Sequence, residues 1–294
     1  MTKTPRLTLI AGPTASGKSR LALEMAEKTG AVIVNADSQQ LYADLRILTA
    51  RPSLEDEAHA EHRLYGVADA AEFWSVGRWT RAVMPLLDEL AAQDRPALLV
   101  GGTGLYFNAL TRGLADIPAV PDAVRATVQA AYDAEGEAAF RRRLTEVDPV
   151  AAAAITPGDR QRLIRALAVA QATGRSLSEW KADTRPLLEP GSYDALVIEP
   201  PRDRLYAACD ARVDVMMAHG ALDEVRALVA RDLPPDLPAM KAVGVRELAA
   251  HLAGDLSLDD AVAAVKQSTR NYAKRQLTWF RNQQRDWPRH PGFA

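Results

Sequence analysis

Short apolar runs alternate with segments of helical periodicity over the first 116 residues. The apolar runs lie at residues 7–11, 31–35 and 97–100. Unbroken runs of this length are typical of strands that are buried on both faces of a parallel sheet. Between them, residues 18–28 and 79–92 repeat apolar side chains at helical spacing, and Gly30 ends the first of these helices. The order β-α-β-α-β predicts an α/β fold, a parallel sheet with helices on both faces.

The pattern changes after residue 116, where prolines punctuate the chain. Alanine-rich helical sequence without a strand-like run follows, and prolines and a glycine at 186–191 close it. Strand character then resumes at 193–199, and helical segments follow at 204–219, 222–230 and 258–285. We therefore predict an α/β core formed by residues 1–116 and 191–294, with an all-helical lobe, residues 117–190, inserted into it.

Charge is balanced over the whole chain but not along it. The 294 residues include 36 basic and 38 acidic side chains, a formal net charge of −2, so a nucleic-acid partner needs a local basic surface. Residues 160–181 carry five basic side chains against one acidic, a net of +4, and residues 264–294 carry seven against one, a net of +6. Such segments either position an RNA through its phosphates or form ordinary solvated helix faces.

The single cysteine and the scattered histidines exclude several kinds of site. Cys209 has no second cysteine for an intrachain disulfide, and no Cys/His cluster has the spacing of a zinc or iron–sulfur site. The segment 1–7 lacks the apolar core of a signal peptide, and no apolar run approaches the ~20 residues that a membrane span needs. We therefore expect a cytoplasmic protein without a membrane partner.

Residues 12–19, GPTASGKS, match the GxxxxGK[ST] pattern of phosphate-binding loops (P-loops). The motif follows a predicted strand and opens a predicted helix, which is the context that the pattern requires. Backbone N–H groups of the loop would bind phosphate oxygens, Lys18 would add a charge, and the Ser19 hydroxyl would bind Mg²⁺. The residues expected to bind a diphosphate or triphosphate are Gly12, Thr14, Ala15, Ser16, Gly17, Lys18 and Ser19.

Two further strand ends supply candidate catalytic groups. Asp37 follows the second predicted strand, and the run Gly101-Gly102-Thr103-Gly104 follows the third. Since the carboxyl ends of parallel strands face the ligand crevice, Asp37 is expected beside the phosphate site, as a general base, a Mg²⁺ ligand or simply a helix cap. Thr103 would offer a hydroxyl to the same crevice or cap the helix that follows. We identify no other acid at the ends of these motif strands.

Motifs along nearly the whole chain resemble those of the tRNA dimethylallyltransferases (isopentenyl-diphosphate:tRNA transferases). They are GPTASGKS at 12–19, DSQQLY at 37–42, LTARP at 48–52, LVGGTGLY at 99–106, QRLIRAL at 161–167 and the segment TRNYAKRQLTWFR at 269–281. The chain departs from the family at Gly66, where many members have aspartate, and at Ala208-Cys209, where many have Arg-Ile. Arg212, one turn further on, is retained. The resemblance implies a P-loop NTPase-like core, a helical insertion and dependence on Mg²⁺.

The reaction that the resemblance implies is transfer of a dimethylallyl group from dimethylallyl diphosphate to N6 of the adenosine 3′-adjacent to the anticodon of tRNA. Asp37 would take a proton from the amine, and Thr103 would orient the amine or the bridging oxygen. Arg212, Lys18 and Mg²⁺ at Ser19 would stabilise the departing diphosphate. The acceptor base must flip out of its stack to reach a buried carboxylate, and a glutamine amide can hydrogen-bond an adenine edge.

The expected partners are therefore dimethylallyl diphosphate and the anticodon stem-loop of tRNA. We expect the protein to be a monomer. The helical insertion and the C-terminal helix would hold the RNA. The residues expected to contact tRNA are Asp37, Ser38, Gln39, Gln40, Thr103, Arg125, Gln161, Arg162, Leu163, Ile164, Arg165, Lys274, Arg275 and Arg281.

Two other functions remain open from the residues alone. A P-loop small-molecule kinase would use ATP and take a lid from the insertion, but the third strand lacks the terminal Asp that holds Mg²⁺ in many P-loop NTPases. A non-catalytic, nucleotide-gated RNA-binding protein would use Asp37 only to hold Mg²⁺. Phosphate release or ADP formation with candidate acceptors would identify a kinase. Replacing Asp37 by Ala distinguishes the RNA-binding protein from an enzyme, because binding survives in both cases but only the enzyme loses turnover.

Overall fold

A computed structural model describes residues 7–292. Six strands within this range form one sheet, in which all neighbouring strands are parallel. The strands are β1 (Leu7–Ala11), β2 (Val32–Asn35), β3 (His62–Arg63), β4 (Ala97–Gly101), β5 (Asp194–Ile198) and β6 (Arg289–His290), in the spatial order β3-β2-β4-β1-β5-β6. Segment 1–7, which lacks the apolar core of a signal peptide, lies mostly outside the described residues, because positions 1–6 are not described. The P-loop follows β1, so its neighbours are the ends of β4 and β5.

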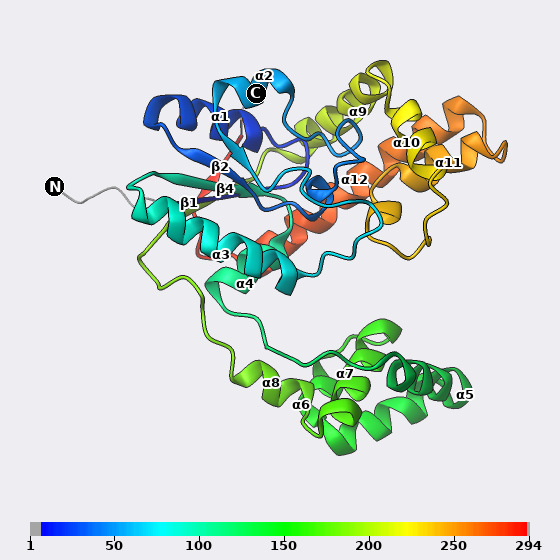
Figure 1. The fold of residues 1–294 in the computed structure, drawn as a ribbon. Coiled ribbons are helices and arrows are strands. Elements are labelled where there is room, and N and C mark those ends of the chain that lie inside the picture. Colours follow the sequence, from blue (N-terminus) through cyan, green and yellow to red (C-terminus); the bar gives the residue numbers. More distant parts are fainter. Residues whose placement is uncertain (1–6, 293–294) are drawn as a thin grey trace. The chain divides into compact units, whose positions relative to one another are not determined.

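Helices cover both faces of the sheet, as the unbroken apolar strands predict. In Figure 1, α1 (Lys18–Thr29) lies on one side of the strands, and α3 (Val76–Ala92) and α4 (Gly104–Thr111) lie on the other. Alternate side chains of each strand enter opposite layers because successive residues of a strand point to opposite faces. Ile10 therefore packs in the layer of α1, whereas Leu9 joins the larger core with Trp79 of α3.

The helices after β5 complete this unit beside the carboxyl edge of the sheet. They are α9 (Arg202–Ala218), α10 (Ala221–Val229), α11 (Val245–Leu252) and α12 (Leu258–Gln283). Helix α12 packs on α9, α11 and α4, so it runs past the ends of several strands. Gly104 at the start of α4 makes one close approach possible, since a Cβ there would lie 2.0 Å from the Trp279 ring.

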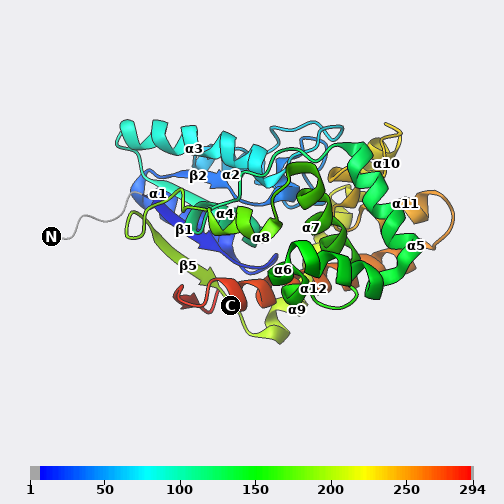
Figure 2. The same ribbon diagram turned by 90° about the horizontal axis from the view of Figure 1, so that it is seen from below.

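The chain divides into two compact units, one comprising 1–111 with 188–294 and the other comprising 112–187. The second unit holds α5 (Asp122–Val147), α6 (Pro149–Ala154), α7 (Arg160–Thr173) and α8 (Leu177–Ala182), and its residues, all described, contain no strand. These helices pack on one another (Figure 2) around a separate core that includes Phe140, Leu163 and Leu167. Helix α5 kinks at Gly136, where φ is 74°. The bounds lie close to the predicted lobe, residues 117–190.

Several elements have no counterpart among the predicted ones. The edge strands β3 and β6 have two residues each, too few for a recognisable pattern, and α2 (Leu54–His59) has no buried residue. Helix α3 begins at Val76 because the Ser75 hydroxyl accepts a hydrogen bond from the Arg78 N–H at 3.1 Å.

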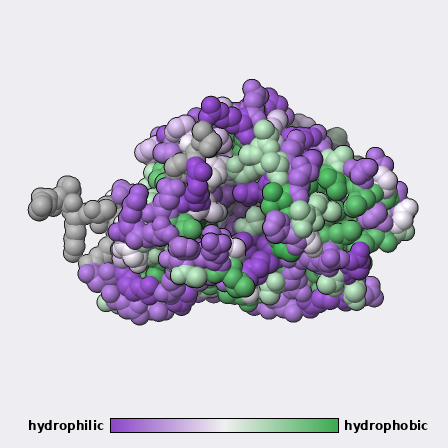
Figure 3. Space-filling model, turned by 90° about the horizontal axis from the view of Figure 1, so that it is seen from above, coloured by the Kyte–Doolittle hydropathy of each residue, from purple (hydrophilic) through white to green (hydrophobic). Residues whose placement is uncertain are grey.

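On the face shown in Figure 3, apolar side chains are interspersed among hydrophilic ones. Within residues 7–292, no helix has the length and apolar character needed to cross a membrane.

Candidate active site

The phosphate loop has a backbone that only particular residues can adopt. Gly17 has φ of 87°, in the left-handed region where glycine is favoured, and α1 begins at the next residue. A Cβ on Gly12 would lie 2.9 Å from the Ser16 hydroxyl oxygen and 3.0 Å from the Ile198 carbonyl oxygen. The two glycines of the motif therefore let the loop close tightly between β1 and β5. Ser16 is buried, and its hydroxyl has no hydrogen-bond partner among the described residues.

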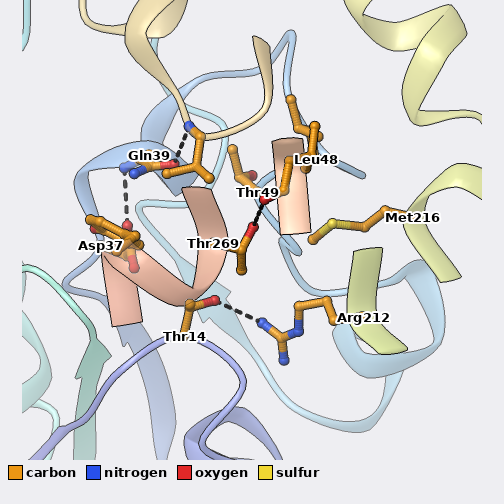
Figure 4. A pocket seen from close by; sticks show the side chains of 11 residues that line it. Thr14, Asp37, Gln39, Leu48, Thr49, Arg212, Met216 and Thr269 are labelled. Carbon is orange, nitrogen blue, oxygen red and sulfur yellow. Dashed lines mark hydrogen bonds between the residues drawn. The ribbon is translucent and has the colours of Figure 1, made fainter. Parts of the chain in front are cut away.

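Two cations, buried Lys18 and half-buried Arg212, converge on this loop. Lys18 is 8% exposed and donates to the Pro13 carbonyl at 3.0 Å. Burial lowers the pKa of Lys18 to about 8, with Asp37 opposing and Arg212 adding to the shift. Arg212 of α9 donates to the Thr14 hydroxyl at 3.3 Å (Figure 4), and burial also lowers its pKa. Two desolvated cations near one carboxylate favour an anionic ligand, as a phosphate site requires.

Asp37 is fixed at the end of β2 with its carboxylate in the same region. The side chain is 7% exposed, and one carboxylate oxygen accepts the Gln39 N–H at 3.1 Å, so Asp37 caps the short 3₁₀ helix Ser38–Leu41. Asn35 holds its backbone on both sides, accepting from the Asp37 N–H at 2.7 Å and donating to the Asp37 carbonyl at 3.0 Å. The capping role and a role in the pocket are therefore compatible.

Thr103 lies beside Asp37 because the ends of β2 and β4 approach closely. A Cβ on Gly101 would lie 2.0 Å from the Ala36 carbonyl oxygen, so a larger residue would separate the two strand ends. The Thr103 hydroxyl accepts the Ser38 N–H at 2.9 Å and lies 3.2 Å from the Ser38 hydroxyl. The structure thus brings together three of the predicted residues, Ser38, Asp37 and Thr103.

A pocket connects the phosphate loop with Asp37. Its wall is lined by Thr14, Asp37, Gln39, Leu48, Thr49, Arg212, Met216, Val243, Val265, Thr269 and Tyr272. Four of these side chains are apolar, and Figure 4 shows Leu48 and Met216 on the side away from Asp37. Burial raises the pKa of the Tyr272 hydroxyl, and Asp37 adds to the shift, so Tyr272 stays protonated. The pocket offers a carboxylate, an anion-binding loop and an apolar wall together.

Gln39 and Gln40, both predicted to contact tRNA, hold parts of this wall. Gln40 donates from its side-chain amide to the carbonyls of Thr49 and Ala50, at 2.9 and 2.7 Å. The Gln39 side-chain oxygen accepts the Val243 N–H at 3.2 Å. These bonds occupy one hydrogen-bonding group of each amide and fix the backbone beside the pocket.

Glu224 is a residue that the sequence analysis missed. Its carboxylate accepts the backbone N–H groups of Arg46, Ile47 and Leu48, at 2.6, 2.8 and 2.8 Å. Leu48 and Thr49 line the pocket, so Glu224 holds one wall of it from α10. An acid on an amphipathic helix gives no sequence signal for this role, because the same pattern describes a solvated face.

At Gly66, one of the departures from the family, the left-handed backbone favours glycine and a flexible neighbouring side chain fills the adjacent space. Gly66 has φ of 59°, and a Cβ there would lie 2.3 Å from the guanidinium of Arg51. Arg51 donates to the carbonyls of Tyr42 and Ala43 at 3.4 and 3.3 Å. Arg51 therefore occupies the space of a side chain at position 66. The other departure, Cys209, packs with Leu205 in a small apolar cluster against Ala15 of the phosphate loop.

The residues predicted to contact tRNA in the helical unit divide by burial. Gln161, Arg162 and Arg165 are exposed, whereas Leu163 and Ile164 are 0% and 7% exposed and pack in the core of that unit. The side chains of this buried pair hold α7 in place and do not reach the surface. Arg125 is exposed and pairs with Asp122.

Distant acids neutralise much of the basic C-terminal segment. On α12, Lys266 pairs with Asp214 at 2.6 Å and Arg270 with Asp210 at 2.5 Å. Lys274 and Arg275 are exposed and have no acidic partner within residues 7–292. The net of +6 therefore overstates the free positive charge.

Arg281 has an acidic partner at the end of β5. It donates to Glu199 at 2.8 Å, and Arg289 lies 3.6 Å from the same carboxylate. The sheet therefore has a second acid at a strand end, but β5 is not one of the motif strands, at whose ends we expect no acid other than Asp37. Glu199 is already engaged by two arginines, which leaves Asp37 as the acid that lines the pocket.

Family models match most of the chain. The model described as IPP transferase matches residues 40–283, and the model described as isopentenyl transferase matches residues 5–71. The chain is 59% identical to the tRNA dimethylallyltransferase of Caulobacter sp. (strain K31) over 284 residues, which cover 97% of this chain and 92% of the relative. It is also 59% identical to the protein of the same name from Phenylobacterium zucineum over 285 residues, with the same coverage.

Solved structures of similar proteins show the same fold. The tRNA isopentenylpyrophosphate transferase of Bacillus halodurans superposes with a TM-score of 0.68 at 33% identity, over 98% of this chain and 90% of that one. A eukaryotic dimethylallyltransferase acting on tRNA superposes with a TM-score of 0.80 at 26% identity, over 93% and 69%. The core accordingly has the P-loop NTPase-like fold of these enzymes. The chain belongs to the tRNA dimethylallyltransferase family, the IPP transferases.

Proposed function

We propose that the protein transfers a dimethylallyl group from dimethylallyl diphosphate to N6 of the adenosine 3′-adjacent to the anticodon of tRNA, releasing diphosphate. The observation that carries this proposal is a single pocket lined by the carboxylate of Asp37, by Thr14 of the phosphate loop and by Arg212. The family supplies the reaction, and the pocket supplies a base and an anion site close enough to act on one substrate pair.

The diphosphate end of the donor fits the phosphate loop. Burial removes the water that would stabilise the positive charges of Lys18 and Arg212. A diphosphate bound beside them stabilises these charges in place of water. As the C1–O bond breaks, negative charge grows on the leaving oxygen, and these two groups stabilise it. The loop thus promotes departure of a diphosphate and needs no NTP hydrolysis.

The five-carbon tail fits the apolar part of the pocket. Leu48, Met216, Val243 and Val265 line it and belong to four different segments. Apolar contacts favour a hydrocarbon group and exclude water, which would otherwise capture an electrophilic prenyl carbon.

Asp37 acts on the acceptor. The N6 lone pair of adenine is delocalised into the ring, so the amine is a weak nucleophile. The new N6–C1 bond forms as the C1–O bond breaks, and Asp37 takes the N6 proton, which keeps the product neutral. Thr103, hydrogen-bonded to Ser38 beside it, orients the amine.

We also propose Mg²⁺ as a cofactor. Within residues 7–292, no three His, Cys, Asp or Glu side chains form a metal-binding cluster. This suits Mg²⁺, which often takes only one or two protein ligands and completes its shell with substrate phosphates and water. Ser19, exposed at the start of α1, would contribute a hydroxyl oxygen. When bound, the ion would neutralise charge on the diphosphate.

The tRNA is held by exposed groups around the site and on the helical unit. We assign phosphate contacts to Lys274 and Arg275 of α12 and to Arg162 and Arg165 of α7, all of which are exposed. The protein is expected to work in the cytoplasm as a monomer, with both substrates entering the pocket of one chain.

The direct test is incubation of labelled dimethylallyl diphosphate with tRNA and Mg²⁺, followed by nucleoside analysis. We expect label on N6 of the adenosine next to the anticodon, and none with an Asp37→Ala variant that still binds tRNA. Absence of transfer by the wild-type protein would overturn the proposal. Assaying ADP formation from ATP in parallel tests the kinase alternative, which the relatives do not favour.

A further inference from the structure

One side-chain amide joins the two loops that flank the pocket. Gln276 of α12 is 5% exposed. Its side-chain oxygen accepts the backbone N–H of Thr14 in the phosphate loop at 2.8 Å, and its side-chain nitrogen donates to the carbonyl of Gly102 at 2.9 Å. Gln276 therefore connects the loop that follows β1 with the loop that follows β4.

The fit around this amide is close. The space where Gly102 would carry a Cβ is bordered by the Gln276 side-chain nitrogen at 2.1 Å and by a carboxylate oxygen of Asp37 at 3.1 Å. No side chain fits at position 102 without displacing one of them. The amide and the carboxylate thus border the same space beside Gly102.

Only a carboxamide can make both bonds as observed. Thr14 offers an N–H and needs an acceptor, whereas Gly102 offers a carbonyl and needs a donor. A carboxylate of the same shape would serve Thr14 but would face the Gly102 carbonyl with a second acceptor. An apolar side chain of the same length would leave both backbone groups unpaired.

The amide is also held on a rigid element. On the same helix, Ala273, Leu277 and Phe280 are buried, and the Trp279 ring packs against Gly104 just beyond the second loop. Rotation or translation of Gln276 relative to the sheet is therefore restricted by packing on either side of it.

We propose that Gln276 is a positioning residue for prenyl transfer. This inference rests on the proposed function. Gln276 sets the separation between the phosphate loop, which holds the leaving diphosphate, and the Gly102–Thr103 loop, which faces the acceptor amine. Since reacting atoms must be held about 3–3.5 Å apart, a shift of about 1 Å between these loops reduces the rate by up to about 100-fold.

The test compares Gln276→Met, which makes neither bond, with Gln276→Glu, which keeps the acceptor for Thr14. Gln267→Met on the exposed face of the same helix is the matched control. We expect Gln276→Met to lower kcat by about 10–100-fold while the Kd for inorganic diphosphate changes less than threefold, because Lys18 and Arg212 remain. The control should retain wild-type kcat.

Backbone amide exchange at Thr14 reports the bridge without turnover. The Thr14 N–H should be protected in the wild-type protein and in Gln276→Glu, and should exchange faster in Gln276→Met. Unchanged exchange in Gln276→Met would overturn the inference. So would a kcat within twofold of wild type, or a parallel loss of kcat, diphosphate affinity and Tm, which would indicate a purely structural role. Failure of the wild-type protein to transfer label would instead refute the proposed function.

Discussion

The carboxylate of Glu224 accepts the backbone N–H of Leu48 at 2.8 Å, across 176 positions of the sequence. The same carboxylate accepts the two preceding N–H groups. A loop of a binding pocket is thus held by an acid on a helix that does not line that pocket. Its effect on catalysis is therefore indirect and can be measured separately from the chemistry.

Replacement of Glu224 by Ala should loosen the wall formed by Leu48 and Thr49. Three backbone N–H groups lose a charged acceptor, so we expect a loss of about 1–3 kcal/mol in stability and a higher KM for dimethylallyl diphosphate. Asp223→Ala is the control, because Asp223 is exposed on the same helix and pairs with Arg226. Thermal unfolding and steady-state kinetics test this, and equal effects of the two substitutions would contradict it.

Asp37→Asn should lower turnover far more than binding. Asparagine keeps the shape and one acceptor but takes no proton, and general-base catalysis is worth about 10²–10⁴-fold in kcat. Diphosphate affinity should change little, since the phosphate loop is intact. Measuring kcat against Mg²⁺ concentration for both proteins distinguishes the roles. Full recovery at saturating metal would mean that Asp37 is a Mg²⁺ ligand instead.

Binding of dimethylallyl diphosphate should take up protons near pH 8. Burial lowers the pKa of Lys18 to about 8 in the free protein, so part of the lysine is neutral there. A bound anion raises that pKa, and affinity should fall as the pH rises above about 8 because protonation must then accompany binding. The phosphate groups lose their last proton near pH 6 and do not titrate in this range.

Calorimetry at pH 8 in two buffers of different ionisation enthalpy measures this proton uptake. Lys18→Met is the control and should bind more weakly with no uptake from this group. Identical heats in the two buffers for the wild-type protein would show that Lys18 is already fully charged before binding.

Affinity for tRNA should fall steeply with salt concentration. Replacing both Arg162 and Arg165 by Gln should reduce the slope of log K against log salt by about two phosphate contacts. Arg142→Gln, an exposed arginine of the same helical unit, should leave the slope unchanged. Leu163→Ala should lower the stability of that unit instead, because its side chain is in the core. An unchanged slope in the double variant would remove α7 from the RNA interface.

Local sequence patterns predicted much of the fold and part of the candidate site. The apolar runs predicted β1, β2, β4 and β5 to within one residue at each end, because strands covered on both faces are made mostly of apolar side chains. The phosphate loop was equally visible, since its glycines and Lys18 are consecutive in the chain. Asp37 followed from a general rule, that strand ends of a parallel sheet meet at one edge.

Charge was harder to judge from the sequence. Residues 264–294 have a net charge of +6 when counted along the sequence. In the structure, however, Lys266 and Arg270 pair with acids of α9 that lie more than fifty positions away. Counting charges within a segment omits such partners, because ion pairs depend on distances in space.

The sequence by itself determined the four longer strands, the phosphate loop and the identity of the general-base candidate, since each depends mainly on neighbours within a few residues. Tertiary structure alone decided that Gln276 joins the phosphate loop to Gly102, that Glu224 holds Leu48, and that Leu163 is buried. The physical reason is the same in all three cases. A hydrogen bond or a packing contact depends on which surfaces meet after the helices have docked, and residue type alone does not specify the partner.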